Sequence, residues 1–171
     1  MRMPLCGADS EIPEESQMNH GEIADARFHE GCNCAQAVFT AFCDVTGLSR
    51  PEAMRLSSSF GGGVGRMREI CGALSGAFLV LGWLYGYEEP GDDSVKAAHY
   101  ARVQELAAAF RKQNGSIVCR ELLQNPDSSA VPTPRTEAFY HSRPCARFVR
   151  DTAALLDRYI QDHPPAAGGN P

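Results

Sequence analysis

Cysteine is the residue type with the most reactive chemistry in this chain of 171 residues. Four of the seven cysteines, Cys34, Cys71, Cys119 and Cys145, each fall in the first turn of a different predicted helix. A helix N-terminus presents unpaired backbone N–H groups and the positive end of the helix dipole, which together favour a thiolate over a thiol. Four cysteines placed in this way predict one constructed site for sulfur chemistry.

Helical periodicity turns these four sulfurs toward the interior. Cys34, Cys119 and Cys145 each share a helix face with apolar residues, and Cys71 begins the most apolar helix of the chain. We therefore expect the four sulfurs to meet at one end of a helical bundle. The alternative is that they are four small buried hydrophobic residues, because cysteine is among the most buried residue types.

Electrostatics limits what such a cluster can be. Two thiolates about 4–5 Å apart repel by roughly 3–4 kcal/mol at an effective dielectric constant near 20, whereas a helix N-terminus stabilises an anion by only roughly 0.3–2 kcal/mol. Protons, disulfides, a metal ion or an iron-sulfur cluster must therefore remove charge. Successive members of the set are 37, 48 and 26 residues apart. The chain lacks the Cys-x-x-Cys knuckle common in zinc and iron-sulfur sites, so only the tertiary fold could assemble a ligand set.

A glycine-rich segment precedes Cys71. Residues 61–65 (Gly-Gly-Gly-Val-Gly) lead into Arg66 and Arg68 and could form an anion-binding nest for a carboxylate, a phosphate or an anionic cluster. The candidate cofactor-binding residues beyond the cysteines are Gly62, Gly63, Arg66 and Gly72. A tight turn over the core explains the glycines equally well, and neither a dinucleotide fingerprint nor a P-loop is present.

The other cysteines and the histidines are weaker candidates. Cys32 could pair with Cys34 through a strained disulfide or substitute for it as a metal ligand. His29 and His141 lie close to cysteines, but exposed loop histidines are the commoner outcome for such residues. Cys6 is expected in the N-terminal tail.

Three further residues are expected in the hydrophobic core. Cys43 lies near the end of its predicted helix, on the side of Phe39. His99 stands on an apolar stripe and is predicted to be a core histidine with its hydrogen bonds satisfied, and Trp83 is predicted to be a core aromatic residue.

The pattern between residues 16 and 162 predicts helices and no strand. The predicted helical segments are residues 16–29, 33–46, 49–58, 69–85, 92–114, 117–124 and 144–162. We expect an all-α fold, a compact bundle of about six or seven helices around the central, buried, glycine-rich helix 69–85. Residues 1–15 and 163–171 are expected to be flexible tails flanking one helical domain, 16–162.

Composition limits the cellular compartment and the binding partners that we expect. The net charge is −5 and there is no basic cluster, which argues against nucleic acid and anionic membranes as partners. The glycines in the uncharged helix and the amphipathic helices around it argue against membrane insertion. An odd cysteine count and the lack of an N-terminal apolar run favour a reducing cytoplasm.

Three segments and two later cysteines resemble a known family. Asn33–Val38 (NCAQAV), Phe60–Gly63 (FGGG) and Cys71–Gly76 (CGALSG), followed by lone Cys119 and Cys145, resemble the C_GCAxxG_C_C family of redox-active proteins over about residues 16–160. The resemblance implies a small helical redox domain whose four family cysteines are the four at the helix starts. Some relatives are joined to c-type haem domains, which favours an electron-transfer centre, although this chain lacks Cys-x-x-Cys-His.

Two redox mechanisms remain open, and we favour the first slightly. Either the four cysteines hold a [2Fe-2S] cluster for electron transfer, or two of them cycle between dithiol and disulfide while Arg66 stabilises the attacking thiolate. An oxidoreductase and a non-enzymatic electron carrier both fit. The alternative is a non-catalytic accessory or binding protein with a structural zinc, or with buried thiols alone. The expected partner is a redox protein or a small-molecule electron donor or acceptor, and the glycine notches fit internal packing or a homodimer equally.

Overall fold

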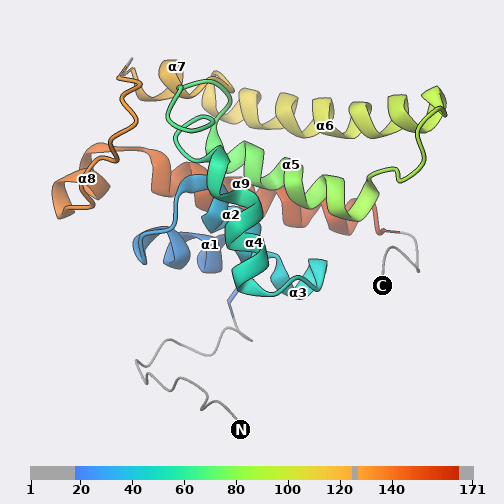
Figure 1. The fold of residues 1–171 in the computed structure, drawn as a ribbon, viewed down its shortest axis with the longest axis horizontal. Helices are drawn as coiled ribbons and strands as arrows, with labels where there is room; N and C mark the ends of the chain where they lie inside the picture. The colour runs from blue at the N-terminus through green and yellow to red at the C-terminus, as the bar shows by residue number, and fades with distance from the viewer. Residues whose placement is uncertain (1–17, 125–126, 166–171) are drawn as a thin grey trace, which may run out of the picture.

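The structure is a computed structural model that describes residues 18–124 and 127–165 (Figure 1). These residues form helices and no strand, which confirms the all-α prediction. The helices are α1 (His20–His29), α2 (Cys34–Ala41), α3 (Cys43–Thr46), α4 (Arg50–Ser57), a short 3-10 helix (Ser58–Phe60), α5 (Gly72–Tyr85), α6 (Asp93–Asn114), α7 (Cys119–Leu123), α8 (Glu137–Ser142) and α9 (Cys145–Asp162).

Local capping signals place the helix starts. The Asn33 side chain accepts a hydrogen bond from the Gln36 N–H (2.9 Å), and the Gln36 side chain accepts one from the Asn33 N–H (3.1 Å). This reciprocal capping box makes Cys34 the first residue of α2. Asp92 caps α6 by accepting hydrogen bonds from the N–H groups of Ser94 and Val95. Both starts were predicted because a cap depends on residues close in sequence.

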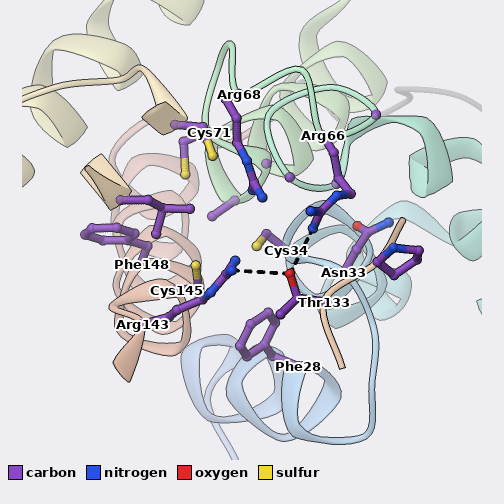
Figure 2. A pocket seen from close by; sticks show the side chains of 18 of the residues that line it. Phe28, Asn33, Cys34, Arg66, Arg68, Cys71, Thr133, Arg143, Cys145 and Phe148 are labelled. Atoms are coloured by element: carbon purple, nitrogen blue, oxygen red, sulfur yellow. Dashed lines mark hydrogen bonds between the residues drawn. The ribbon is translucent and has the colours of Figure 1, made fainter. Parts of the chain in front are cut away.

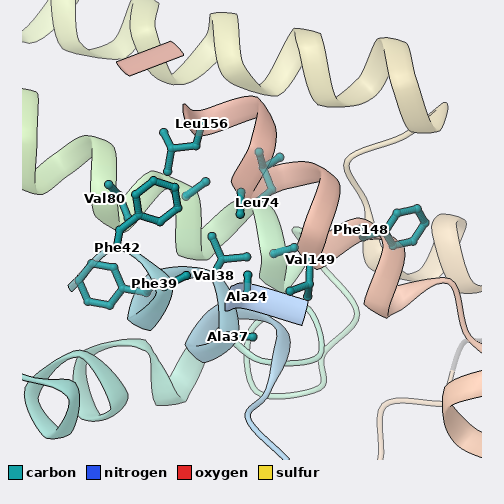
Figure 3. Close-up of a cluster of buried hydrophobic side chains, with 14 of the residues drawn as sticks. Ala24, Ala37, Val38, Phe39, Phe42, Leu74, Val80, Phe148, Val149 and Leu156 are labelled. Carbon is teal, nitrogen blue, oxygen red and sulfur yellow. The ribbon is translucent and has the colours of Figure 1, made fainter. Parts of the chain in front are cut away.

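The core lies between α1, α2, α5 and α9 (Figure 3). Val38 of α2, Leu74 of α5 and Val149 of α9 are fully buried in it. The backbones of α2 and α5 approach closely at Gly76, where an added Cβ would lie 2.6 Å from the carbonyl oxygen of Ala35. Glycine at this position therefore permits the helix contact that brings the start of α2 beside the start of α5.

The predicted burial of two helices is wrong in part. Helix α5 is buried from Gly72 to Ala77 and again at Val80 and Leu81, but Trp83, expected in the core, is 37% exposed. On α6, the apolar stripe predicted to include His99 also contains Val95, Val103, Leu106 and Phe110. Only Leu106 and Phe110 are buried, while Val95 is 45% exposed. His99 is half-buried beside Tyr87, and its Nδ1 has no hydrogen-bond partner among the described residues, so it is not the satisfied core histidine expected. Periodicity identifies the apolar face of a helix but not how far a neighbouring helix covers it.

Two details of the helix map also differ from the prediction. The predicted helix 33–46 is divided at Phe42 into α2 and α3, and helix α8 was not predicted at all. In the described part of the chain, no helix combines the length and apolarity needed to cross a membrane.

Candidate functional site

A cavity of about 300 Å³ lies where the first residues of several helices converge (Figure 2). Cys34, Cys71, Cys119 and Cys145 all line it. Cys34, Cys119 and Cys145 are the first residues of α2, α7 and α9, and Cys71 is the N-cap of α5. The structure thus brings together the four cysteines that helix position singled out in the sequence.

An isolated antiparallel bridge between Ile70 and Val118 holds two of these cysteines side by side. The Cys71 N–H donates to the carbonyl oxygen of Ile117 (2.8 Å), and the Cys119 N–H donates to that of Glu69 (2.6 Å). These two backbone hydrogen bonds join cysteines that are 48 residues apart in sequence. Nothing in the local sequence marks this pairing.

The glycine-rich loop forms one wall of the cavity in an unusual backbone conformation. Besides its glycines, Val64, Arg66 and Arg68 have positive φ angles of 59°, 66° and 62°. The left-handed region costs a non-glycine residue roughly 1–2 kcal/mol, and such strain persists only where surrounding structure imposes it. At Gly63 an added Cβ would lie 2.7 Å from the Cβ of Cys119, so the loop packs directly against that cysteine.

Cys34 is set apart from the other three cysteines by its pKa. A hydrogen bond with the Cys145 side chain is the main influence that lowers the pKa of Cys34 to about 7; burial opposes it, and the charge of Arg135 and the Gly62 N–H assist it. The backbone of Gly72 packs closely against Cys34, since a Cβ added at Gly72 would lie 3.1 Å from the Cβ of Cys34. Cys34 is also half-buried rather than buried.

The other three sulfurs favour the thiol form. Burial, followed by the charge of Cys34, raises the pKa of Cys71 to about 12. Burial also raises the pKa of Cys119, although a hydrogen bond with Arg68 opposes this. The hydrogen bond to Cys34 and then burial raise the pKa of Cys145. The cavity therefore holds one sulfur that ionises near neutral pH beside three that keep their protons.

Four arginines line the same cavity: Arg66, Arg68, Arg135 and Arg143. No Asp or Glu is among its described lining residues. Arg66 Nη1 and Arg143 Nη2 both donate to the Thr133 hydroxyl, at 3.1 and 3.3 Å (Figure 2). The site is therefore electropositive within a chain of net charge −5.

Three of these polar lining residues were missed by the sequence reasoning. Thr133, Arg135 and Arg143 come from residues 127–143, a stretch that carries a single short helix, α8. Arg135 stacks on the Phe28 ring, with 4.5 Å between the guanidinium carbon and the ring centroid, and donates to the carbonyl oxygen of Cys32 (3.0 Å). Scattered cations among aromatic residues are the only sequence signal, and that signal is not specific.

Several weaker candidates lie away from the cavity. The Cys32 thiol is buried and donates to the Met54 sulfur at 3.7 Å, and Cys43 packs against the core. His29 and His141 each hydrogen-bond through Nδ1 to a carbonyl oxygen four residues earlier in their own helices, and neither lines the cavity. Cys6 lies outside the described residues.

The arrangement of side chains can also be compared with a metal site. Within residues 18–124 and 127–165, no group of three or more His, Cys, Asp and Glu side chains is arranged to hold a metal ion. An iron-sulfur cluster spans more space than one ion, and four thiols around an electropositive cavity match the donor type that such clusters use.

Comparison with protein families gives a match over most of the chain. The model of the C_GCAxxG_C_C family, described as "Putative redox-active protein", matches residues 32–159. This chain belongs to the C_GCAxxG_C_C family. Comparisons with curated proteins and with solved structures found no match. The family assignment confirms the resemblance seen in the sequence and indicates a redox role, without specifying the mechanism.

Proposed function

We propose that this C_GCAxxG_C_C protein performs thiol–disulfide exchange through Cys34 and Cys145. The placement of both cysteines as the first residues of helices that line one cavity carries this proposal. The interaction of their side chains supports it, because it lowers the pKa of Cys34 to about 7 and raises that of Cys145. A thiol with a pKa near 7 is about half ionised at neutral pH, whereas an ordinary cysteine is only a few per cent thiolate. Cys34 is also a half-buried residue, whereas Cys71, Cys119 and Cys145 are buried.

The exchange proceeds in two balanced steps. The Cys34 thiolate attacks one sulfur of a substrate disulfide, the substrate S–S bond breaks, and the departing thiolate takes a proton from water. Cys145 then loses its proton and attacks the Cys34 sulfur, which releases the second half of the substrate as a thiol. Two electrons pass from the cysteine pair to the substrate, and a dithiol on a redox partner protein regenerates the pair by the same exchange.

The pKa values of the two cysteines support an order in which Cys34 attacks first and Cys145 second. The main influence that raises the pKa of Cys145 is its hydrogen bond with Cys34. That influence disappears once Cys34 is part of a mixed disulfide, so Cys145 becomes easier to ionise when it must attack. The Gly62 N–H and the charge of Arg135 stabilise the Cys34 thiolate before the first step.

Peptide mapping tests this assignment. Reduced protein treated with bis(2-hydroxyethyl) disulfide should acquire a Cys34–Cys145 disulfide, detected by mass spectrometry. Cys34→Ser should abolish the reaction, and Cys145→Ser should trap the mixed disulfide on Cys34. Cys43→Ser, which changes a cysteine outside the cavity, should behave as the unmodified protein. A disulfide between other cysteines, or an inert Cys34, would contradict the proposal.

A [2Fe-2S] cluster is the second candidate, favoured by the convergence of all four sulfurs on one cavity. Cys34, Cys71, Cys119 and Cys145 would hold it, and the nearby arginines would offset its negative charge. When bound, such a cluster supplies one-electron transfer. Iron and acid-labile sulfide in near-equal amounts, with charge-transfer absorption in anaerobically purified protein, would establish this alternative.

Cys71→Ser separates the two mechanisms. Under the dithiol mechanism this variant keeps the exchange, because the Cys34–Cys145 pair is intact. Under the cluster mechanism it loses iron and the visible absorption, because one of four ligands is gone. If Cys71→Ser exchanges disulfides at the rate of the unmodified protein, and neither protein contains metal, the redox centre is the dithiol.

A further inference from the structure

Three guanidinium groups reach into the cavity beside Cys34 (Figure 2). Arg66 and Arg68 extend from the strained glycine-rich loop, and Arg143 extends from the residues before α9. The Arg68 side chain is nearly inaccessible, at 2% exposure of the residue. Its Nε donates to the carbonyl oxygen of Asp127 (2.6 Å), but its Nη2 has no hydrogen-bond partner among the described residues.

Among the described residues, the groups beside these arginines carry less negative charge than the arginines carry positive charge. The Asp127 carboxylate pairs with Arg66 Nη2 at 3.3 Å, and its side chain is 56% exposed. Cys119 lies beside Arg68, but burial raises the pKa of Cys119 and favours its uncharged form. Burial, and then the positive charge of Arg68, lowers the pKa of Arg66. Since a buried charge is costly unless it is paired, this cluster is suited to a bound anion.

Arg135 does not share this role. Its guanidinium lies over the Phe28 and Phe139 rings and donates to the backbone carbonyl oxygens of Phe28 and Cys32. The Arg135 guanidinium therefore has both hydrogen-bond acceptors and aromatic rings of the protein as partners. Arg66 also has partners, since its three guanidinium nitrogens donate to Ser129, Thr133 and Asp127. Among the described arginines that line the cavity, Arg68 alone is fully buried with an unpartnered nitrogen. A ligand site would therefore centre on Arg68, with Arg66 and Arg143 beside it.

We propose that Arg66, Arg68 and Arg143 form a binding site for an oxyanion group, and that the substrate of Cys34 is a small disulfide carrying carboxylates or similar groups. The identity of this substrate rests on the proposed thiol–disulfide function. Arginine forks bind carboxylate and oxyanion oxygens through paired N–H groups. A cavity of about 300 Å³ lies at the lower end of the range for small-molecule pockets. A substrate held by its anionic group would place its disulfide beside the one sulfur that ionises near neutral pH.

Two small disulfides that differ in charge provide the test. The oxidation rate of Cys34 is measured with 3,3′-dithiodipropionate, a dianion, and with bis(2-hydroxyethyl) disulfide, which is neutral. Each rate is divided by the rate at which 2-mercaptoethanol reacts with the same disulfide, which corrects for the intrinsic reactivity of that disulfide. The protein should then prefer the dianion by about 10-fold or more, as an electropositive cleft raises the local concentration of anions.

Variants assign this preference to the arginine site. Arg68→Met should abolish the preference while changing the rate with the neutral disulfide much less. Arg120→Met is the matched control, because Arg120 pairs with Glu69 outside the cavity and its side chain is 49% exposed. If Arg68→Met does not fold, Arg143→Gln serves instead, and the comparison of the two disulfides on the unmodified protein needs no variant.

Sulfate protection separates this proposal from the proposed function. Millimolar sulfate, compared with chloride at equal ionic strength, should slow iodoacetamide alkylation of Cys34 several-fold in the unmodified protein and not in Arg68→Met. Protection without disulfide formation by either reagent would support the anion site and overturn the thiol–disulfide function. Equal normalised rates with the two disulfides, with no protection by sulfate, would overturn the anion site and leave that function standing.

Discussion

The pKa of Cys34 should depend chiefly on Cys145. The hydrogen bond between these side chains is the largest influence that lowers the pKa of Cys34 to about 7, and burial is the next largest and acts in the opposite direction. Cys145→Ala removes the hydrogen bond and leaves the weaker effects of Arg135 and the Gly62 N–H. We expect the pKa of Cys34 to return to the ordinary range, a rise of about one to two units, or about 1.4–2.7 kcal/mol.

The consequence for reactivity follows from the fraction of thiolate. A rise from a pKa of about 7 to about 8–9 reduces the thiolate at pH 7 from about half to about 1–9%, so alkylation should slow by about 5- to 50-fold. At pH 10 the thiolate forms in both proteins, and the two rates should converge. This convergence distinguishes a change in pKa from a change in access to the sulfur.

The assay is the rate of iodoacetamide modification of the peptide containing Cys34, followed by mass spectrometry between pH 5 and pH 10. Cys145→Ser places a hydroxyl donor where the thiol was and should restore part of the shift. Cys43→Ala is the control that removes a cysteine outside the cavity. A midpoint near 8.5 in the unmodified protein, or one that Cys145→Ala leaves in place, would refute the reasoning.

Two further predictions concern stability. His20 stacks on Phe42 and contacts the carboxylates of Asp157 and Asp44; burial lowers its pKa, but these two partners raise it more. A raised pKa in the folded state stabilises the protein below the unfolded value near 6.5, so on the order of 1 kcal/mol should be lost as pH rises through the folded pKa. The difference in free energy of unfolding between the unmodified protein and His20→Gln, measured by urea titration, should narrow above that pH, and a difference independent of pH would contradict the linkage. Gly76→Ala should lower the free energy of unfolding by about 1–3 kcal/mol through overpacking, whereas Gly82→Ala, with no atom within 4 Å of the added Cβ, should be neutral or stabilising. Equal effects of the two alanines would count against the close contact of α2 and α5.

The sequence and the structure agree best where local interactions decide the outcome. The start of α2 at Cys34 follows from the side chains of Asn33 and Gln36, which lie within four residues of each other. The starts of α5, α7 and α9 likewise fall at their cysteines. Because helix starts and the inward direction of a face are local properties, the convergence of four sulfurs could be anticipated from the sequence.

The cationic half of the cavity could not be predicted in this way. Arg143 and Thr133 are only 10 residues apart, with α8 between them, but Arg66 precedes Thr133 by 67 residues. The contact of Arg66 with Thr133 depends on the left-handed conformation of the loop at Arg66 and Arg68, a conformation rare for residues other than glycine. Only the assembled fold shows that the cysteines and the arginines share one cavity.

The protonation of Cys71 supplies a last test of which redox centre operates. Holding an iron-sulfur cluster requires Cys71 to lose its proton, and with a pKa of about 12 this costs about 7 kcal/mol at pH 7 before any compensation from the metal. Cluster assembly should therefore release protons and strengthen steeply as pH rises above 7. The first step of thiol–disulfide exchange needs only the Cys34 thiolate, so the rate of mixed-disulfide formation should level off above a midpoint near 7. Anaerobic iron-sulfide reconstitution and disulfide exchange, measured over the same pH series, distinguish the two. Reconstitution independent of pH would show that Cys71 is already ionised and would contradict the assigned protonation of the cavity.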